Sequence, residues 1–458
     1  MLKARGFPRL RSGQAMLKGI EDKIKSYLRA NKKYAIKLLS NLIEIPTINP
    51  PGENYEKMVD FLEGECIKLG LAVRKYVTPK QVLDKYGVKG GSKRISLVAD
   101  LDEGYRKTFH INFHYDVVPA TDKWKTDPFR AMVKDGRIYG RGSEDMKGTI
   151  ASALFALKAL NECSINPKIN IQLSFTPDEE IGGRTGLGYL VGKGLVKADY
   201  AMSEGYSGNY ISVGNKGVLW AEIEVIGKSA HGSMPYKGVN SFERMNMLVD
   251  ELEKLKNKIL KRKTRYNMRD AISKNATFVM GGFLEGGVKI NVVPGIAKFS
   301  IDRRLIPEEN IGAAKKEIKA VINKFNKRCK DSKVNIRFVS QGSPAISKRD
   351  DAFFKTAADS IKATIGRKAN FSVMPGATDM RYFMWKGIPS LGYSASGGEK
   401  WHSDNEFVYI DSLVDTANVY ALIIKRLNSQ NKSYSFCELT GKNCYGRKGY
   451  KNIRGKGA

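Results

Sequence analysis

The alternation of strand-like and helix-like segments in the first half of the chain constrains the fold most. "TFHINFHYDVV" (108–118) and "KINIQLSF" (168–175) are apolar runs of strand length, and "TIASALFALKALNE" (149–162) between them has the period of a helix. Strands joined through helices run parallel, and a parallel sheet is covered by helices on its faces. We therefore expect an α/β domain with a mostly parallel sheet, whose ligands bind at the carboxyl ends of the strands.

From about residue 217 the pattern changes. The strand-like "VLWAEIEVIG" (218–227) precedes a helix-like segment (241–260), and two strands, a helix and a further strand follow. This βαββαβ order predicts a small ferredoxin-like α+β domain. A helix near residue 350 returns to the first pattern, so the small domain is inserted into the larger one. The predicted domains are a discontinuous catalytic domain (1–216 and 340–430), an insert (217–339), and a basic, disordered tail (431–458).

Composition places the chain among soluble globular proteins. Of its residues, 42% are hydrophobic and 27% are charged. Its length of 458 residues exceeds what one ordinary hydrophobic core accommodates, so two domains are expected. No window approaches the roughly 18 apolar residues of a membrane span, and the N-terminus lacks a signal-peptide core. We expect a cytoplasmic protein that does not enter membranes. Among five scattered cysteines, Cys437 and Cys444 could form a bridge or half of a metal site, but free thiols are the favoured interpretation.

The net charge of +31 could attract nucleic acid, anionic lipid or acidic substrates. The excess of basic residues is spread along the chain, with local concentrations at 256–269 and 442–458. A solvated basic surface is therefore favoured over a nucleic-acid site. The alternative from another class is a basic nucleic-acid-binding protein on a hydrolase-derived fold. Metal-free protein with salt-sensitive RNA binding would support that alternative.

The sequence has only four histidines, at positions 110, 114, 231 and 402. We interpret His110 as an ordinary core residue. His114 differs because "HYD" at a strand end puts Asp116 on the same face, where an aspartate can accept the spare ring N–H of a metal-bound histidine. His402 lies in "KWHSDNEF", close to further carboxylates.

Two adjacent glutamates, Glu179 and Glu180, follow a buried strand in "SFTPDEEIGGRTG". A buried carboxylate costs several kcal/mol unless a positive group meets it. Asp145 in "YGRGSEDMKG" and Glu204 in "AMSEGYSG" are also expected at loops or strand ends. Together with two histidines, these carboxylates are the nitrogen and oxygen ligands that zinc accepts.

Six motifs occur in the order found in the di-zinc metallopeptidase and amidohydrolase family that includes acetylornithine deacetylase, succinyl-diaminopimelate desuccinylase and glutamate carboxypeptidase. The resemblance covers roughly residues 34–427 and implies a zinc-peptidase-like catalytic domain with an inserted dimerisation or lid domain. Single motifs would be weak, but six in order are specific. The motifs are "HYDVVPA", "YGRGSEDMKGTIAS", "TPDEEIGG", "GKSAHGSMPYKGVNS", "INVVPG" and "HSDNEFV".

The resemblance also implies a ligand set. His114 and Glu204 would hold one zinc, Glu180 and His402 the other, and Asp145 would bridge them, with Co²⁺ as a possible substitute. Asp116 would orient His114. Glu179 would be the general base, which takes a proton from the attacking water and delivers it to the leaving amine.

Residues of the insert and a late loop are implied in substrate handling. His231 would stabilise the oxyanion in the active site of a partner subunit, which implies a homodimer. Asn291 and Arg303 are similar to groups that contact substrate, the arginine by pairing with a carboxylate. Thr378 lies in "PGATDMRYF", which resembles the Gly-x-Ser/Thr-Asp-x-Arg segment of the desuccinylases.

The resemblance predicts an N-acyl amino acid amidohydrolase of lysine or arginine biosynthesis. A glutamate at position 204 tends to accompany deacylases and carboxypeptidase-like members. A broader aminoacylase or a carboxypeptidase is the alternative, so the substrate is an N-acyl amino acid or a small peptide. The chain departs from the family at Phe113, where glycine is usual, and at Gly205, where proline is frequent; neither change removes a ligand.

Overall fold

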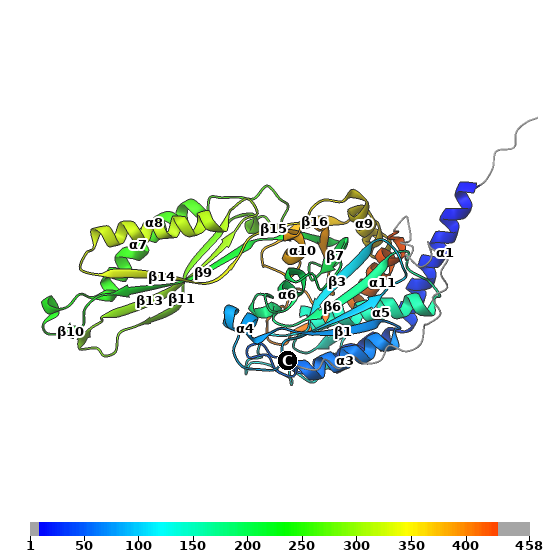
Figure 1. The fold of residues 1–458 in the computed structure, drawn as a ribbon, viewed down its shortest axis with the longest axis horizontal. Helices are drawn as coiled ribbons and strands as arrows, with labels where there is room; N and C mark the ends of the chain where they lie inside the picture. The colour runs from blue at the N-terminus through cyan, green and yellow to red at the C-terminus, as the bar shows by residue number, and fades with distance from the viewer. Residues whose placement is uncertain (1–8, 429–458) are drawn as a thin grey trace, which may run out of the picture.

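The computed structural model describes residues 9–428, with side chains from Lys18 onward. The predicted tail, with Cys437 and Cys444, lies outside the described residues. The chain forms a large α/β domain and a smaller insert that extends from it (Figure 1). No helix in the described part is long and apolar enough to cross a membrane.

A nine-stranded mixed sheet forms the centre of the larger domain. The neighbours β6, β3, β7 and β17 run parallel, whereas the pairs β1–β2 and β2–β6 toward one edge are antiparallel. Across the sheet the strands are β1 (Ala72–Val77), β2 (Ile95–Leu101), β6 (Asn170–Thr176), β3 (Thr108–His114), β7 (Tyr200–Ser203), β17 (Ser390–Gly392), β8 (Tyr210–Asn215) and β15 (Ala345–Ile346), with β16 (Asn370–Met374) beside β8.

Helices cover both faces of this sheet. One face carries α3 (Tyr55–Lys68), α5 (Gly148–Glu162), α9 (Asp351–Ile365) and α11 (Ile410–Arg426), with α1 (Arg9–Ala30) and α2 (Lys32–Ile43) packed outside them. The other face carries α6 (Leu187–Gly192) and α10 (Arg381–Trp385). The remaining elements of the domain are α4 (Lys80–Tyr86), the short strands β4 (Met132–Lys134), β5 (Arg137–Tyr139) and β18 (Phe407–Tyr409), and the single turns η1 (Ser143–Lys147) and η2 (Glu179–Ile181).

Strand β3 shows how the sequence sets the two faces. Its residues alternate in direction, so the ring of Phe113 lies near that of Tyr420 in α11, with ring centroids 6.5 Å apart. His110 points the opposite way, and its ring lies 4.8 Å from that of Phe383 in α10. His114 shares the face of His110, which turns it away from the larger helical layer.

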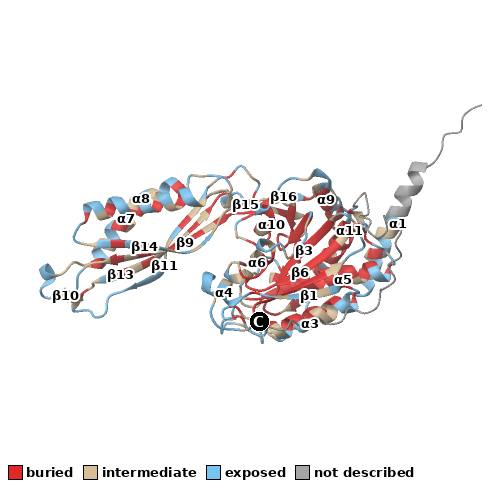
Figure 2. Ribbon diagram, in the orientation of Figure 1, coloured by how far each residue is buried: buried red, intermediate tan, exposed pale blue. Residues whose placement is uncertain are grey.

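The insert has its own core (Figure 2). Its four-stranded antiparallel sheet has the order β11-β13-β9-β14, and alternate residues of β9 are buried beneath two helices. The asparagines Asn240 and Asn310 cap these helices by accepting main-chain N–H groups. The elements are β9 (Gly217–Ile226), α7 (Ser241–Ile259), β11 (Thr277–Gly286), β13 (Ile296–Leu305), α8 (Ile311–Arg328) and β14 (Lys333–Gly342), with the pair β10 (Ala230–His231) and β12 (Val292–Val293) and the turns η3 (Pro235–Lys237) and η4 (Ile272–Lys274).

The predicted fold class is confirmed: a large sheet whose central strands run parallel lies in a helical sandwich and carries a ferredoxin-like insert. Strand β14 ends at Gly342, so the predicted insert boundary at residue 339 falls within that strand.

Candidate metal centre

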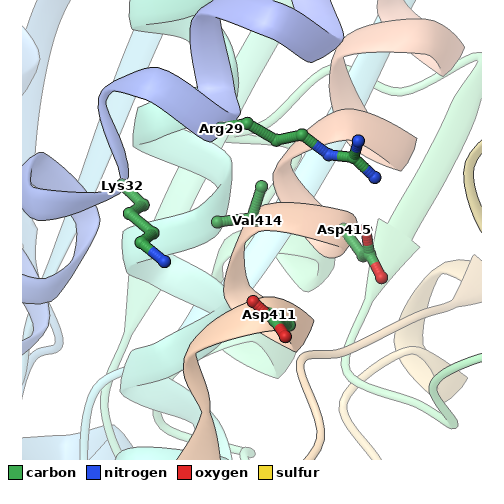
Figure 3. A pocket seen from close by; sticks show the side chains of 5 residues that line it. All are labelled: Arg29, Lys32, Asp411, Val414 and Asp415. Carbon is green, nitrogen blue, oxygen red and sulfur yellow. The ribbon is translucent and has the colours of Figure 1, made fainter. Parts of the chain in front are cut away.

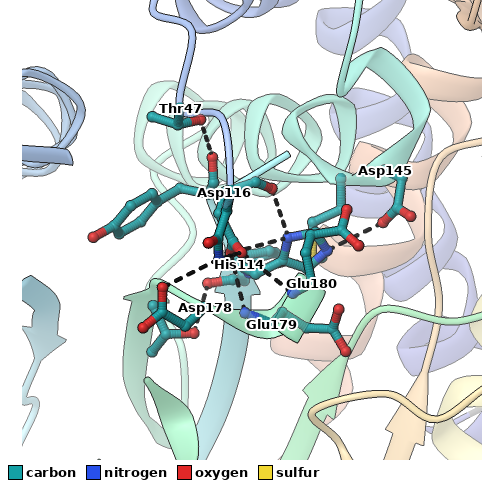
Figure 4. A network of polar contacts seen from close by, with 12 residues as sticks. Thr47, His114, Asp116, Asp145, Asp178, Glu179 and Glu180 are labelled. Atoms are coloured by element: carbon teal, nitrogen blue, oxygen red, sulfur yellow. Dashed lines mark hydrogen bonds and ion pairs between the residues drawn. The ribbon is translucent and has the colours of Figure 1, made fainter. Parts of the chain in front are cut away.

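His114 ends β3, and its ring meets carboxylates from other segments (Figure 4). Its Nε2 lies 3.1 Å from Asp145 Oδ1 and 3.0 Å from Glu204 Oε2. Its Nδ1 lies 3.0 Å from the main-chain carbonyl oxygen of Asp116. We predicted the Asp116 carboxylate as the partner of this ring nitrogen, but its Oδ1 is 3.7 Å away. The residue is the expected one, but the accepting atom is the carbonyl, because the carboxylate has other partners.

The Asp116 carboxylate holds the turn that carries the adjacent glutamates. Its Oδ1 accepts the N–H of Glu179 and its Oδ2 that of Glu180, each at 3.2 Å. These amides open η2, whose first orphan N–H groups need such an acceptor. The two side chains then leave the turn in different directions (Figure 4). One turn can therefore hold one glutamate at a metal and its neighbour beside it.

Asp178, the residue immediately before this turn, is held by a buried network of polar side chains. It is fully buried and lies 3.2 Å from Arg94 Nε, which is buried as well. It also accepts hydrogen bonds from Thr185 Oγ1 at 2.5 Å, Tyr55 OH at 3.2 Å and Asn49 Nδ2 at 3.1 Å. Sequence reasoning missed this network, because its members come from three distant segments and "GSKRIS" around Arg94 has the composition of a surface loop.

A second histidine completes the arrangement. His402 Nε2 lies 3.0 Å from Glu180 Oε2 and 3.4 Å from Asp145 Oδ2. Asp145 therefore offers one oxygen to each histidine. The candidate ligand groups are His114, Asp145 and Glu204, and Asp145, Glu180 and His402; within each, the potential ligand atoms lie within 4.8 Å of one another.

The electrostatics of these groups favour a cation. Burial would lower the pKa of His114, but the carboxylates of Asp145 and Glu204 outweigh it and raise that pKa well above its usual value. Hydrogen bonds with Asp145 and Glu180 raise the pKa of His402 to about 10. Burial raises the pKa of Glu180 to about 7. Protons thus neutralise the carboxylates where divalent cations could do so.

The donor set fits a divalent metal. Imidazole nitrogens and carboxylate oxygens are the ligands of zinc and its neighbours in the first transition row. Glu180 Oε1 is buried and has no hydrogen-bond partner in the described part of the chain. A buried carboxylate oxygen in that state is costly, and a cation next to Glu180 would relieve the cost.

Glu204 is held on its second oxygen. It follows β7, and its Oε1 accepts the main-chain N–H of Asp379 at 2.9 Å, which leaves Oε2 for the metal centre. Thr378 precedes Asp379, and its buried hydroxyl has no partner among the described residues. Thr378 thus lies beside the metal centre, and its substrate contact stays a prediction.

Two predicted residues of the insert come together far from this centre. β10 pairs with β12, and Gly232 N–H donates to the Asn291 carbonyl oxygen at 2.8 Å. His231 and Asn291 are both exposed, and His231 Nδ1 lies 2.7 Å from Ser233 Oγ. Figure 1 places β10 at the end of the insert remote from the catalytic domain. Within one chain, neither residue reaches His114.

Arg303 does not fit the predicted substrate contact. Its side chain is buried in the insert, where it lies 2.8 Å from Glu309 and 2.7 Å from Glu317. It also donates to the carbonyl oxygen of Ala314 at 3.2 Å. Because β13 turns this residue toward α8, the guanidinium ties the sheet of the insert to its helix.

His110 is a buried histidine with its hydrogen bonds satisfied, as we interpreted it: its Nε2 lies 2.7 Å from Ser174 Oγ and its Nδ1 3.0 Å from Gln172 Oε1.

A separate hollow of about 370 Å³ lies between α1, α2 and α11 (Figure 3). It is lined by Arg29, Lys32, Asp411, Val414 and Asp415, none of which belongs to the ligand groups.

The fold and the site are those expected of a metallohydrolase: an α/β sheet presents two candidate groups of histidine and carboxylate ligands that share one aspartate. The model of peptidase family M20/M25/M40 matches residues 110–426. The chain belongs to this family and is a metallohydrolase that acts on amide bonds.

Individual relatives agree with this assignment. The chain is 30% identical over 430 residues to an uncharacterized metallohydrolase of Methanocaldococcus jannaschii, across 85% of this chain and 98% of the relative. It is 26% identical to aminoacylase-1 of Mus musculus, across 86% and 95%. The fold is similar to that of an M20 family metallo-carboxypeptidase of Sulfolobus solfataricus, with a TM-score of 0.69 at 22% identity, over 85% of this chain and 98% of that one.

Proposed function

We propose that the protein is a di-zinc amidohydrolase that removes the acyl group from N-acyl amino acids. The observation that carries this proposal is the pair of ligand groups sharing Asp145, with Glu179 beside them but in neither. The similarity to aminoacylase-1 supports the substrate class. Zinc is proposed because both groups combine imidazole with carboxylate, and Co²⁺ would suit the same ligands.

Glu179 is the proposed general base. Burial raises its pKa well above the usual value, and the neighbouring Glu204 and Asp379 add to the effect. When bound, the two metals would polarise the scissile carbonyl and lower the pKa of the attacking water, so that the water could lose a proton and act as a nucleophile near neutral pH. Glu179 takes the proton of that water and passes it to the leaving nitrogen. A carboxylate fixed by its main chain to Asp116 can do both without moving the turn.

The acyl group and the amino acid remain predictions. The lysine or arginine biosynthetic substrates inferred from the sequence are one possibility within this class. The carboxypeptidase alternative shares the same metal centre, so residues around Thr378 and the insert would decide between the two.

We propose further that the active site is shared between two chains of a homodimer. His231 and Asn291 lie exposed at the far end of the insert, where a second chain could receive them. The insert also exposes large apolar side chains: Phe242 is 60% exposed, Leu284 66% and Ile290 106%. Phe242 and Leu284 line a hollow of about 350 Å³ next to the edge strand β11. A second copy that covers this face would remove it from water.

A substrate panel tests the activity. Purified chain, stripped with a chelator and reloaded with zinc, is assayed on N-acetyl, N-succinyl and longer N-acyl amino acids and on dipeptides. The proposal expects zinc-dependent release of the free amino acid from an N-acyl substrate at the highest kcat/KM. Cleavage confined to peptides would support the carboxypeptidase alternative, and no zinc-dependent amide hydrolysis would contradict the proposal.

Subunit complementation tests the shared site. Glu179→Ala and His231→Ala chains are each expected to be inactive, the latter by about 100- to 1000-fold for one lost oxyanion donor. After subunit exchange, mixed dimers contain one site with both residues, so activity should partly return. No recovery despite demonstrated exchange, or a chain that stays monomeric, would contradict the shared site.

A further inference from the structure

Two loops from distant parts of the sequence carry candidate metal ligands. A buried glutamate of each loop accepts hydrogen bonds from the main chain of the other. The first loop holds Asp145, and its Glu144 reaches across to the loop of His402. The Glu144 carboxylate accepts three main-chain N–H groups there, from Gly397 at 2.6 Å, Glu399 at 2.9 Å and Lys400 at 2.6 Å.

Glu406 makes the reverse connection. Its Oε1 accepts the N–H groups of Glu144 at 2.8 Å and Asp145 at 3.1 Å. Its Oε2 accepts the N–H of Gly142 at 3.0 Å and pairs with the buried Arg141 at 2.8 Å. The two glutamates, which we call the latch, therefore bind each other's loop through six main-chain amides.

The segment that carries His402 is packed closely enough, where it meets Glu144, to demand a glycine. A Cβ atom on Gly397 would lie 1.5 Å from the carbonyl oxygen of Phe407 and 3.1 Å from Glu144 Oε2. The clash with Phe407 lies within the segment that carries His402, so a residue other than glycine would prevent this segment from closing on itself beside Glu144. Burying two carboxylates near Asp145 also costs free energy, which the amide donors offset.

The two histidines of the metal centre differ in what holds them. His114 is buried at the end of a strand, and the Asp116 carbonyl oxygen fixes its Nδ1. The His402 side chain is 53% exposed, its φ is 59°, and no hydrogen bond to its Nδ1 is found in the described part of the chain. A metal-bound histidine usually has such a partner for its second nitrogen. For His402, the main chain of its loop must supply the positioning.

We infer that Glu144 and Glu406 are positioning residues for the metal subsite of Asp145, Glu180 and His402, and that the subsite of His114, Asp145 and Glu204 depends on them less, because it shares only Asp145 with the two loops. The inference rests on the proposed dinuclear centre. It predicts an asymmetry: breaking the latch lets the His402 loop move against Asp145, whereas His114 and Glu204 stay in place on β3 and after β7.

The test titrates zinc ions into the full chain after chelator treatment, with calorimetry as the readout. Wild type should bind two ions. Glu144→Gln and Glu406→Gln should each bind one ion with an affinity close to that of wild type and the other about 10- to 100-fold more weakly, as is typical when a partner of a metal ligand is lost. At one equivalent of zinc, an anomalous difference map should place the retained ion between His114 and Glu204.

Glu309→Gln is the matched control. Glu309 lies in the insert, is largely buried, pairs with Arg303 and accepts a main-chain N–H from Ile306, so its loss should lower the melting temperature without changing either zinc affinity. If the latch variants also lower the melting temperature yet bind both ions like wild type, the latch is purely structural and the inference is overturned. Equal weakening of both ions also overturns it. Glu144→Asp, which keeps the charge, gives the same test if the glutamine variants do not fold. Wild type that binds fewer than two ions would instead overturn the proposed function.

Discussion

Removal of the metals should make the stability of the folded chain fall as the pH rises. In the metal-free site, burial raises the pKa of Glu180 from 4.5 to about 7 and that of Asp379 from 3.8 to about 7. Hydrogen bonds with Asp145 and Glu180 raise the pKa of His402 to about 10. Each of these groups holds its proton more tightly in the folded chain than in the unfolded one.

The sign of the effect follows from proton release. Between pH 4.5 and 7, folded Glu180 keeps a proton that the unfolded chain has already lost, so its contribution to stability declines by about 1.4 kcal/mol per pH unit. Over that interval Glu180 alone accounts for about 3 kcal/mol. Above pH 6.5, His402 acts in the same direction until the pH passes its folded pKa. Bound metal replaces these protons, so metal binding strengthens as the pH rises.

The assay compares melting temperatures of stripped and zinc-loaded protein from pH 5 to pH 8 by calorimetry. The gap between the two should widen by several degrees across this range. In stripped Glu180→Gln protein the decline with pH should be shallower, because one of the titrating groups is gone. A gap that stays constant or narrows toward pH 8 would show that these groups do not hold protons more tightly in the folded, metal-free chain.

Three substitutions test other parts of the account. Glu179→Gln should lower kcat by about 10²- to 10⁴-fold and leave both zinc ions bound; loss of one ion in elemental analysis would show that Glu179 is itself a ligand. Asp178→Asn leaves Arg94 buried without its counter-ion and should lower the free energy of unfolding by about 3–5 kcal/mol in urea titrations, which an unchanged midpoint would contradict. Arg303→Met should destabilise the insert through its lost ion pairs and leave KM unchanged; a raised KM at unchanged stability would restore the predicted substrate contact.

The position of the site residues at strand ends could be predicted from the sequence. The apolar run before His114 and the run before Glu179 predicted two strands, which the structure shows as the adjacent parallel pair β3 and β6. Parallel neighbours end at the same edge of a sheet, so side chains that follow them meet there. The change in hydrophobic periodicity near residue 217 predicted the insert, because the alternation of apolar and polar residues along β9 matches the alternate burial of its side chains.

Contacts between loops that are distant in the sequence could not be predicted. Glu144 and Gly397 are far apart in the sequence, and neither loop has a periodicity that would predict their approach. The partner of His114 Nδ1 was assigned to the wrong atom, since a main-chain carbonyl leaves no mark on the sequence. Arg303 was misjudged because the pattern around the doublet with Arg304 does not say which arginine faces the core. The structure buries Arg303 and leaves Arg304 beside Trp220.

The most direct test of the central claim is a crystal structure of the zinc-loaded chain, with anomalous scattering recorded on both sides of the zinc absorption edge. We expect two zinc peaks, one held by His114 and Glu204 and the other by Glu180 and His402, with an oxygen of Asp145 on each and Glu179 on neither. A single peak, no peak, or Glu179 in the place of Glu180 would contradict it.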